Sequence, residues 1–281
     1  MKPRLDSRGS DLASIDSSVR EGTQTGDSNG AVQPFVSIIV PAYNEESRLD
    51  RCLQRLRQHA SEELGDNVEM IIVDDGSDDR TVECARAQLR HFPHSQLLRL
   101  PWHSGKGAAV RLGVTAARGG VIVFMDADLA TDLKALALAL EALRDAEVAV
   151  GSRAIPGAVL TGHSRLRSIL HRTFRSQVGR LTGVSATDPQ CGFKAFRSEA
   201  AKPLFAISRI EGFAFDVEVL LLAQKLDYRI VEVPVHWHSV TGSHIRVLRD
   251  ALAILRDSLK VRLLYHRKAP LDTWADPQRS Q

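Results

Sequence analysis

The chain has 281 residues, of which 43% are hydrophobic, and carries a formal net charge of +3 at pH 7. This length and composition allow one large α/β domain and exclude a chain that is disordered throughout. Three scattered cysteines, Cys52, Cys84 and Cys191, argue against a disulfide framework and favour a reducing compartment.

The two ends of the chain differ in composition from the rest. Residues 1–34 mix Ser, Gly, Asp, Thr and Gln with few large apolar residues, so we expect a disordered tail there and another over 269–281. We expect no signal peptide, because the start of the chain has no apolar core segment. We also expect no membrane span, because even the run Val219–Ala223 is far shorter than the roughly 18 residues required.

Apolar, β-branched runs alternate with helical spacing in the first half of the chain. The predicted strands are Val36–Val40, ended by Pro41, then Glu69–Val73, Gln96–Leu100, Val121–Met125 and Glu147–Gly151. Helices are expected between them, with Asn44 and Ser77 as N-caps of the first two and Ala108–Ala117 as the third. Short connections of this kind predict a parallel sheet with right-handed crossovers and helices on both faces.

Polar residues follow four of the predicted strands. These are Tyr43 and Glu45, Asp74 and Asp75, Asp126 and Asp128, and Ser152 and Arg153. In parallel sheets ligands bind outside the carboxyl ends of the strands, so we expect these side chains to converge on one edge.

The pair Asp126 and Asp128 stands at the end of a strand that is expected to be buried on both faces. Aspartates at i and i+2 on extended backbone point to the same side, and hard carboxylate oxygens suit Mg2+ or Mn2+. An Asp-rich turn without a ligand is the alternative. Lys106 begins a predicted helix, where backbone N–H groups and an ammonium both favour phosphate.

The second half of the chain is basic and less regular. Residues 153–186 contain no acidic residue, and a basic amphipathic helix is expected over Arg165–Arg175. A second basic helix is expected over Ile245–Tyr265, with Val247, Leu248, Leu252, Leu255, Leu259 and Leu263 as its apolar residues. Each helix suits either an anionic lipid surface or docking on the domain.

Between these two helices lie three further predicted elements. A turn over Asp188–Lys194 leads into a short strand, and a helix follows that is lined by Phe215, Val219, Leu222 and Leu226. The alternation of Val231, Val233, Val235 and Trp237 predicts one strand, with Pro234 marking an edge position or a bulge.

Eight short motifs occur in an order that resembles one enzyme family. They are Val40-Pro-Ala-Tyr-Asn-Glu-Glu46, Val73-Asp-Asp-Gly-Ser77 with Asp79 and Thr81, Gly105-Lys-Gly107, Asp126-Ala-Asp128, Gly151-Ser-Arg153, Asp188-Pro-Gln-Cys-Gly-Phe-Lys194, Phe215-Asp-Val-Glu218 and Glu232-Val-Pro-Val235. Together they resemble the inverting family 2 glycosyltransferases, more narrowly the polyprenol (dolichol) phosphate sugar synthases. The segment from Asp188 to Lys194 and the Ala130-Thr131 pair look most like the dolichyl-phosphate glucosyltransferase branch.

The resemblance implies a GT-A fold: a mostly parallel sheet flanked by helices, with a C-terminal extension of short strands and basic helices. We expect one catalytic domain over 35–268, with a nucleotide-sugar half at 35–152, an acceptor half at 153–244 and a basic helix at 245–268. The implied donor-binding residues are Pro41, Ala42, Tyr43, Glu45, Asp74, Asp75, Lys106, Asp126 and Ala127.

The resemblance also implies a Mg2+ or Mn2+ ion on Asp126 and Asp128, with catalytic roles for Asp128, Arg153, Asp188 and Gln190. Arg153, Lys194 and Arg246 are the candidates for contact with an acceptor phosphate. In two places the chain departs from the pattern. His244 replaces a lysine common in relatives, and Ala130 replaces a glutamine that ligates the metal in mannosyl synthases.

The expected reaction is metal-dependent transfer of a hexose, glucose from UDP-glucose first, to polyprenyl phosphate. Alternatives are transfer from GDP-mannose, a non-lipid acceptor with Asp188 or Asp216 as base, or a degenerate fold that only binds membrane or RNA. We expect peripheral contact with the cytoplasmic face of a membrane through the basic helices, and allow for a membrane-protein partner. No nucleic-acid partner is expected, because stacked-aromatic motifs are absent from the sequence.

Overall fold

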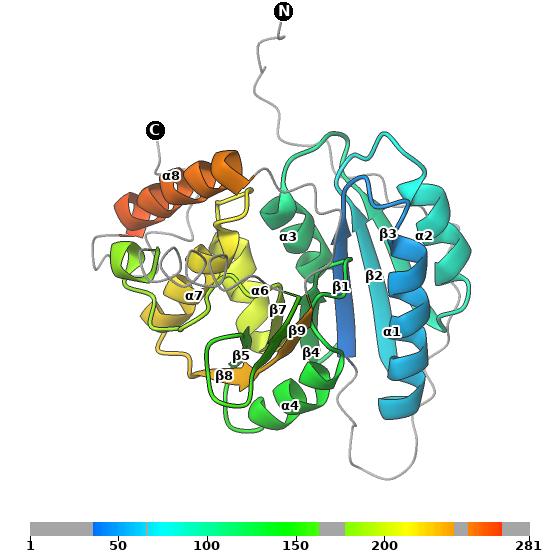
Figure 1. The fold of residues 1–281 in the computed structure, drawn as a ribbon, viewed down its shortest axis with the longest axis horizontal. Coiled ribbons are helices and arrows are strands. Elements are labelled where there is room, and N and C mark those ends of the chain that lie inside the picture. Colours follow the sequence, from blue (N-terminus) through cyan, green and yellow to red (C-terminus); the bar gives the residue numbers. More distant parts are fainter. Residues whose placement is uncertain (1–35, 66, 163–177, 239–246, 266–281) are drawn as a thin grey trace, which may run out of the picture.

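The computed structural model describes residues 36–65, 67–162, 178–238 and 247–265. In this part of the chain a seven-stranded sheet lies between two layers of helices (Figure 1). Its strands are β1 (Val36–Ala42), β2 (Val68–Asp74), β3 (His94–Arg99), β4 (Val121–Met125), β5 (Val148–Ser152), β7 (Phe193–Arg197) and β8 (Ile230–Pro234). The mostly parallel sheet expected from the sequence is therefore observed.

The strand order across the sheet is β3-β2-β1-β4-β7-β5-β8. β7 runs antiparallel to both of its neighbours, β4 and β5, and the other pairs of this sheet are parallel. This arrangement brings the turn before β7 back to the carboxyl end of β4. Two short strands, β6 (Val159–Thr161) and β9 (His236–His238), form a separate parallel pair.

The helices divide between the two faces of the sheet. One layer contains α1 (Leu49–Glu63), α2 (Thr81–Leu89) and α4 (Lys134–Ala142), and the other contains α3 (Lys106–Ala116), α6 (Ser198–Ile207) and α7 (Phe215–Lys225). α8 (Val247–Tyr265) packs beside α7 at the upper left of Figure 1. Among the described residues, no helix combines the length and apolarity that a membrane crossing requires.

β4 shows why the central strands read as continuous apolar runs. Val123 and Met125 face the core under α1 and α4, whereas Ile122 and Phe124 face the core under α3 and α7. Side chains alternate along a strand, so a strand covered on both faces needs apolar residues at every position. The strand ends where the first solvent-reaching carboxylate, that of Asp126, begins.

The expected end of β1 at Val40, before Pro41, is wrong by two residues, because the strand continues to Ala42. The Ala42 carbonyl accepts from the Asp75 N–H, so Ala42 faces β2 and the alternate residue Pro41 faces the β4 side. Pairing with β4 ends at Ile39, and no strand there requires the N–H that proline lacks. Pro41 therefore fits inside the strand.

Both predicted N-caps are also wrong. α1 begins at Leu49 and α2 at Thr81, each several residues after the expected cap. Asn44 adopts a φ of 54°, its N–H donates to Ser77 Oγ at 2.9 Å, and its Oδ1 accepts from the Asp78 N–H at 3.0 Å. These two polar side chains hydrogen-bond to the backbone of the opposite loop and so connect the loops, which Ser and Asn side chains can do in place of capping a helix.

The single strand expected around Val235 is divided into two. β8 ends at Pro234, on the edge of the large sheet as its proline suggested, and β9 begins at His236 and pairs with β6. The third helix and the helix lined by Phe215 form where expected. The basic helix expected over Arg165–Arg175 and the whole of residues 239–246 lie outside the described residues.

Candidate active site

Loops that follow different strands meet at the carboxyl edge of the sheet. The Ser104 N–H, after β3, donates to Asp75 Oδ1, after β2, at 2.7 Å. Lys106 Nζ, at the start of α3, lies 2.5 Å from Asp126 Oδ1, after β4. The convergence expected from the parallel topology is therefore present.

Asp126 and Asp128 lie in a tight turn directly after β4. The turn is closed by the Leu129 N–H, which donates to the Asp126 carbonyl, so the backbone is not extended as the sequence suggested. Burial and the neighbouring Asp126 carboxylate raise the pKa of Asp128. A second carboxylate so close to the partly buried Asp128 carboxylate creates a demand for a cation at this point.

Gly192 makes room for Asp126 on the neighbouring loop. The Asp126 N–H donates to the Gly192 carbonyl at 3.1 Å, and a Cβ at Gly192 would lie 2.0 Å from Asp126 Oδ2. Any side chain at this position would displace the carboxylate. The turn before β7 therefore takes part in shaping the acidic site.

Lys106 provides the positive charge nearest to Asp126. Burial alone would lower the pKa of Lys106, but the Asp126 and Asp216 carboxylates outweigh burial and raise it, so the ammonium stays charged. Its Nζ also lies 5.8 Å from the centre of the Phe215 ring. A fixed cation at the start of a helix and beside a metal-type carboxylate pair suits a phosphate group.

The two aspartates fit a divalent cation of the Mg2+ or Mn2+ type. Both are partly exposed, and Asp128 Oδ1 accepts from the Ala130 N–H at 2.9 Å, which fixes the carboxylate in place. Within the described residues no group of three or more His, Cys, Asp or Glu side chains surrounds a metal position. Such an ion would therefore complete its shell with water and with oxygen atoms of a bound diphosphate.

A second cluster forms between the loops after β1, β2 and β3. Tyr43 is 37% exposed and stacks on His103, with 3.8 Å between the ring centres. His103 Nδ1 lies 2.8 Å from Asp75 Oδ2. An aromatic face beside a carboxylate can receive a flat base with an N–H group.

The other residues expected to bind the nucleotide shape the backbone around this cluster. Asp74 is fully buried, accepts from the Ser77 N–H and lies 3.0 Å from Arg99 Nε, so its carboxylate already has protein partners, and the expected contact with a nucleotide stays a prediction. Ala42 and Ala127 are buried, and Pro41 is partly buried within β1. Glu45 forms an ion pair with Arg48.

Arg153 and Asp188 form a two-point ion pair beside β5. Arg153 Nε and Nη2 lie 2.7 Å and 2.9 Å from the two oxygens of the fully buried Asp188 carboxylate. Burial alone would lower the pKa of Arg153, but the Asp188 carboxylate outweighs burial and raises it. Asp188 therefore holds Arg153 in position and is committed to that task, while Gln190 lies partly buried two residues later.

The Lys194 side chain is buried and paired with a carboxylate. Its side chain is fully buried in β7, and Nζ donates to Asp216 Oδ1 at 2.7 Å and to the Cys191 carbonyl at 2.8 Å. An ammonium that leaves both partners would leave the buried Asp216 carboxylate without its counter-charge, which is costly. The structure thus gives Lys194 a structural partner, its expected phosphate contact stays a prediction, and the third candidate, Arg246, lies outside the described residues.

Two residues of the site, His103 and Gly192, are not indicated by the sequence. His103 lies between the third strand and the Gly105-Lys106-Gly107 motif, and only the fold shows that it stacks on Tyr43. Gly192 belongs to the Asp188–Lys194 motif, but the need for a missing side chain depends on its distance from Asp126.

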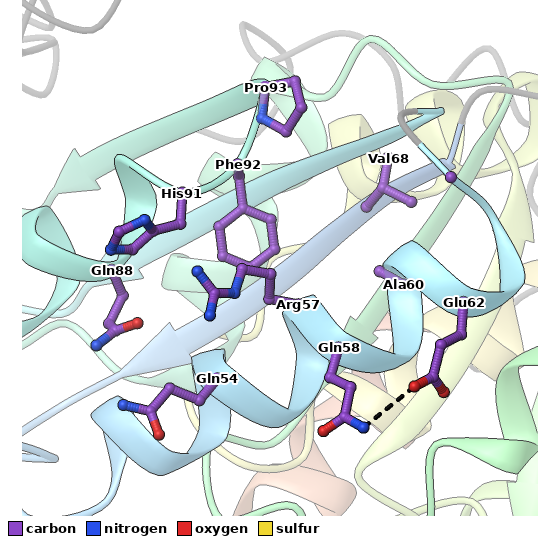
Figure 2. A pocket seen from close by; sticks show the side chains of 11 residues that line it. Gln54, Arg57, Gln58, Ala60, Glu62, Val68, Gln88, His91, Phe92 and Pro93 are labelled. Carbon is purple, nitrogen blue, oxygen red and sulfur yellow. Dashed lines mark hydrogen bonds between the residues drawn. The ribbon is translucent and has the colours of Figure 1, made fainter.

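A separate hollow of about 810 Å³ lies between α1 and α2 (Figure 2). It is lined by residues that include Arg57, Gln88, His91 and Phe92, and it opens where β2 and β3 begin. Because the acidic turn lies at the other ends of the strands, this hollow shares no residue with the candidate site.

A mostly parallel sheet with a carboxylate pair after its central strand is the arrangement of the GT-A glycosyltransferases. A glucosyl-3-phosphoglycerate synthase from Mycobacterium tuberculosis, solved with Mn2+, UDP and glucosyl-3-phosphoglycerate, matches with a TM-score of 0.57 at 20% identity over 82% of this chain and 79% of its own. A mannosyltransferase from Pyrobaculum calidifontis, solved with GDP-Man and Mn2+, matches with a TM-score of 0.58 at 20% identity, covering 87% and 70% of the two chains.

The family follows from the sequence comparisons. Residues 37–205 match the model of Glycosyl transferase family 2, and the chain is a glycosyltransferase of that family. Relatives include the dolichyl-phosphate beta-glucosyltransferases of Dictyostelium discoideum, 35% identical, and Drosophila melanogaster, 38% identical. Each match covers 82% of this chain and 75% of the relative.

Proposed function

We propose that this glycosyltransferase moves glucose from UDP-glucose to the phosphate group of a polyprenyl phosphate of the dolichyl type. The observation that carries the proposal is the similarity, over 82% of the chain, to proteins named dolichyl-phosphate beta-glucosyltransferase. Direct attack on an α-linked donor inverts the anomeric carbon and gives the β-linked product that those names state.

The state of two buried carboxylates supports a phosphate acceptor. A hydroxyl acceptor would need a general base, for which the sequence offered Asp188 and Asp216. Asp188 is held by Arg153, and Asp216 is held by Lys194. A phosphate monoester needs no base, because its second pKa is near 6 and its oxygen is already a nucleophile.

The residues at the carboxyl edge of the sheet then divide into those that bind the donor and those that position the acceptor. Asp126 and Asp128 would hold a Mg2+ or Mn2+ ion, which as a Lewis acid neutralises the charge that develops on the leaving diphosphate. Lys106, beside Asp126, would bind the same diphosphate through its ammonium. Arg153, aligned by Asp188, reduces the repulsion between acceptor phosphate and donor and so helps to position the nucleophile.

One assay separates the proposed reaction from its alternatives. Purified protein is incubated with Mn2+, polyprenyl phosphate and either labelled UDP-glucose or labelled GDP-mannose, and the label in the organic phase is counted. Transfer from UDP-glucose is expected. Transfer only from GDP-mannose would point to a mannosyl synthase, and hydrolysis without lipid labelling would point to another acceptor.

A binding module that only retains the fold is the non-enzyme alternative. It predicts that membrane or RNA binding persists in Asp126→Ala and Asp128→Ala variants and that donor turnover is absent in every variant. We expect the reverse, namely donor turnover that these two substitutions abolish. Membership in a transferase family favours the enzymatic function over the binding module.

α8 supports peripheral contact with a membrane. Its docked side carries Ser258, Val261 and Tyr265, all buried, whereas Leu259 and Leu263 are 47% and 71% exposed. Arg256, Lys260 and Arg262 are exposed near these leucines. Apolar side chains beside exposed cations suit the interface of an anionic bilayer. Three free cysteines fit the reducing, cytoplasmic side of that membrane.

A further inference from the structure

A stack of two rings covers the carboxylate beside the proposed base site. The Tyr43 and His103 rings lie 3.8 Å apart with 22° between their planes, and His103 Nδ1 lies 2.8 Å from Asp75 Oδ2. A carboxylate can only accept, so Nδ1 carries the hydrogen of this bond. His103 thus presents to its neighbours a flat ring with an N–H donor.

Asp75 has no other open side. The N–H groups of Ser104 and Gly105 donate to its two oxygens at 2.7 Å and 2.9 Å, and its side chain is only 4% exposed. The His103 side chain on its outer side is 53% exposed. A ligand that reaches Asp75 from solvent therefore has to take the position of the imidazole.

The backbone of His103 is fixed while its side chain borders solvent. A Cβ at Gly76 would lie 2.5 Å from the Trp102 carbonyl carbon and 2.6 Å from the His103 nitrogen, so the two loops pack main chain against main chain. The imidazole can rotate away from Asp75 without moving this contact, because rotation about χ1 requires no backbone change.

We propose that His103 is a placeholder for the nucleobase of the donor, an inference that rests on the proposed use of a UDP-sugar. In the free protein the imidazole occupies the face of Tyr43 and the hydrogen bond to Asp75. In the donor complex uracil takes both, because it is also flat and its N3–H also donates. Cytosine presents an acceptor at N3 and is repelled by the carboxylate, so the same position selects uracil over cytosine.

The first test compares UDP binding by the wild type and by His103→Ala, using calorimetry in the presence of Mn2+. Removing the competing ring is expected to tighten UDP binding by about three- to tenfold, since a stacked pair of this kind contributes on the order of 1 kcal/mol. His91→Ala, an exposed histidine at the opposite ends of the strands, is the matched control and should not change the affinity.

The second test observes the imidazole directly. Ring protons of His103 are shielded by Tyr43 in the free protein, so their NMR signals should move toward solvent-exposed values when UDP is added, and should move much less with CDP. Weaker UDP binding by His103→Ala, or signals that stay shielded in the complex, would show that His103 supports the base and would overturn the placeholder. A wild type that binds GDP but not UDP would instead contradict the proposed donor, and that result needs no variant.

Discussion

At the scale of single residues, the ionised Asp128 carboxylate lowers the stability of the free protein, and its proposed role in metal binding explains why it is present. Burial and Asp126 raise its pKa, so its charged form is less stable in the folded chain than in the unfolded chain. For a carboxyl group whose pKa is raised by folding, the resulting loss of folding stability is absent well below the pKa in the unfolded chain, about 3.9. It develops as the pH rises through the pKa in the folded chain. The metal that the pair is proposed to bind would remove the cost.

Asp128→Asn is therefore expected to raise the melting temperature in EDTA at pH 7 by about 2 °C while it abolishes transfer activity. The amide keeps an oxygen for the Ala130 N–H and removes the charge. Differential scanning calorimetry at pH 7 and pH 4 measures the effect, which should diminish at pH 4. Asp145→Asn, at an exposed aspartate, is the control; a variant that melts lower than the wild type at pH 7 would contradict the assignment.

Lys106 is expected to matter for the donor and little for the fold. In Lys106→Met the apolar stem remains against Phe215, but the ammonium beside Asp126 is lost. We expect kcat/KM for UDP-glucose to fall by about 100-fold, in the range observed when one charge-stabilising group is removed. Initial rates measure this loss, and Lys134→Met, an exposed lysine on α4, should retain the wild-type value. An unchanged kcat/KM in Lys106→Met would exclude a role in donor binding.

The sequence was informative about these residues because their chemistry follows from local order. Asp126, Asp128 and Lys106 each stand directly after a strand or at the start of a helix, and the topology alone brings them to one edge. The pairing of Lys194 does not follow from local order, because its partner, Asp216, is 22 positions away and belongs to another element. Ion pairs between distant elements depend on packing, which no spacing in the sequence encodes.

At the scale of elements, the amino-terminal ends of three strands are joined by a buried carboxylate. Glu69 of β2 is fully buried and accepts from Ser37 Oγ of β1 at 2.6 Å, from Gln96 Nε2 of β3 at 2.7 Å and from Arg118 Nε before β4 at 2.7 Å. Burial alone would raise its pKa, but these hydrogen bonds outweigh burial and lower it. The carboxylate thus stabilises the folded chain.

Glu69→Ala is expected to lower the free energy of unfolding at pH 7 by about 3 kcal/mol, because it leaves several donors without an acceptor. A lowered carboxyl pKa gives stability that is present above the unfolded value, about 4.3, and is lost as the pH falls through the folded value. The difference from the wild type should therefore shrink below pH 4. Urea unfolding measures it, with exposed Glu63→Ala as control. A loss under about 1 kcal/mol would contradict the network's role.

Strands were more predictable than helix starts. The five strands from Val36 to Ser152 were found within two residues at most ends, because burial on both faces demands an unbroken apolar run. The starts of α1 and α2 were missed, because Asn44 and Ser77 hydrogen-bond to each other's loops. The insertion of antiparallel β7 between β4 and β5 was also not predictable, since it depends on pairing between strands far apart in the sequence, which no local pattern encodes.

At the scale of the whole molecule, the order of motifs was sufficient to predict the fold and the family, since the motifs of the first half each end or follow one of the parallel strands. The sequence left the orientation of α8 open. Leu255, Leu259 and Leu263 share one stripe, and the sequence alone does not show whether this stripe docks on the domain or faces a lipid surface. The structure docks α8 through Val261 and Tyr265, because Tyr265 Oη donates to the buried Glu218 carboxylate at 2.7 Å, and so turns two of these leucines outward.

The outward leucines give the last prediction. In flotation with vesicles that contain phosphatidylserine, the double substitution Leu259→Gln and Leu263→Gln is expected to weaken binding by about tenfold, because each leucine loses part of the 1.5–3 kcal/mol, roughly, that full burial of its side chain supplies. Leu138→Gln is the control, since Leu138 is about as exposed as Leu259 but lies on α4, in the other helix layer. Raising the salt concentration should weaken binding of all variants, because the cations of α8 act through screened attraction to the anionic lipid. Equal binding by the double variant and the wild type would show that α8 does not face the bilayer, and the acceptor would then have to reach Arg153 from a membrane held elsewhere.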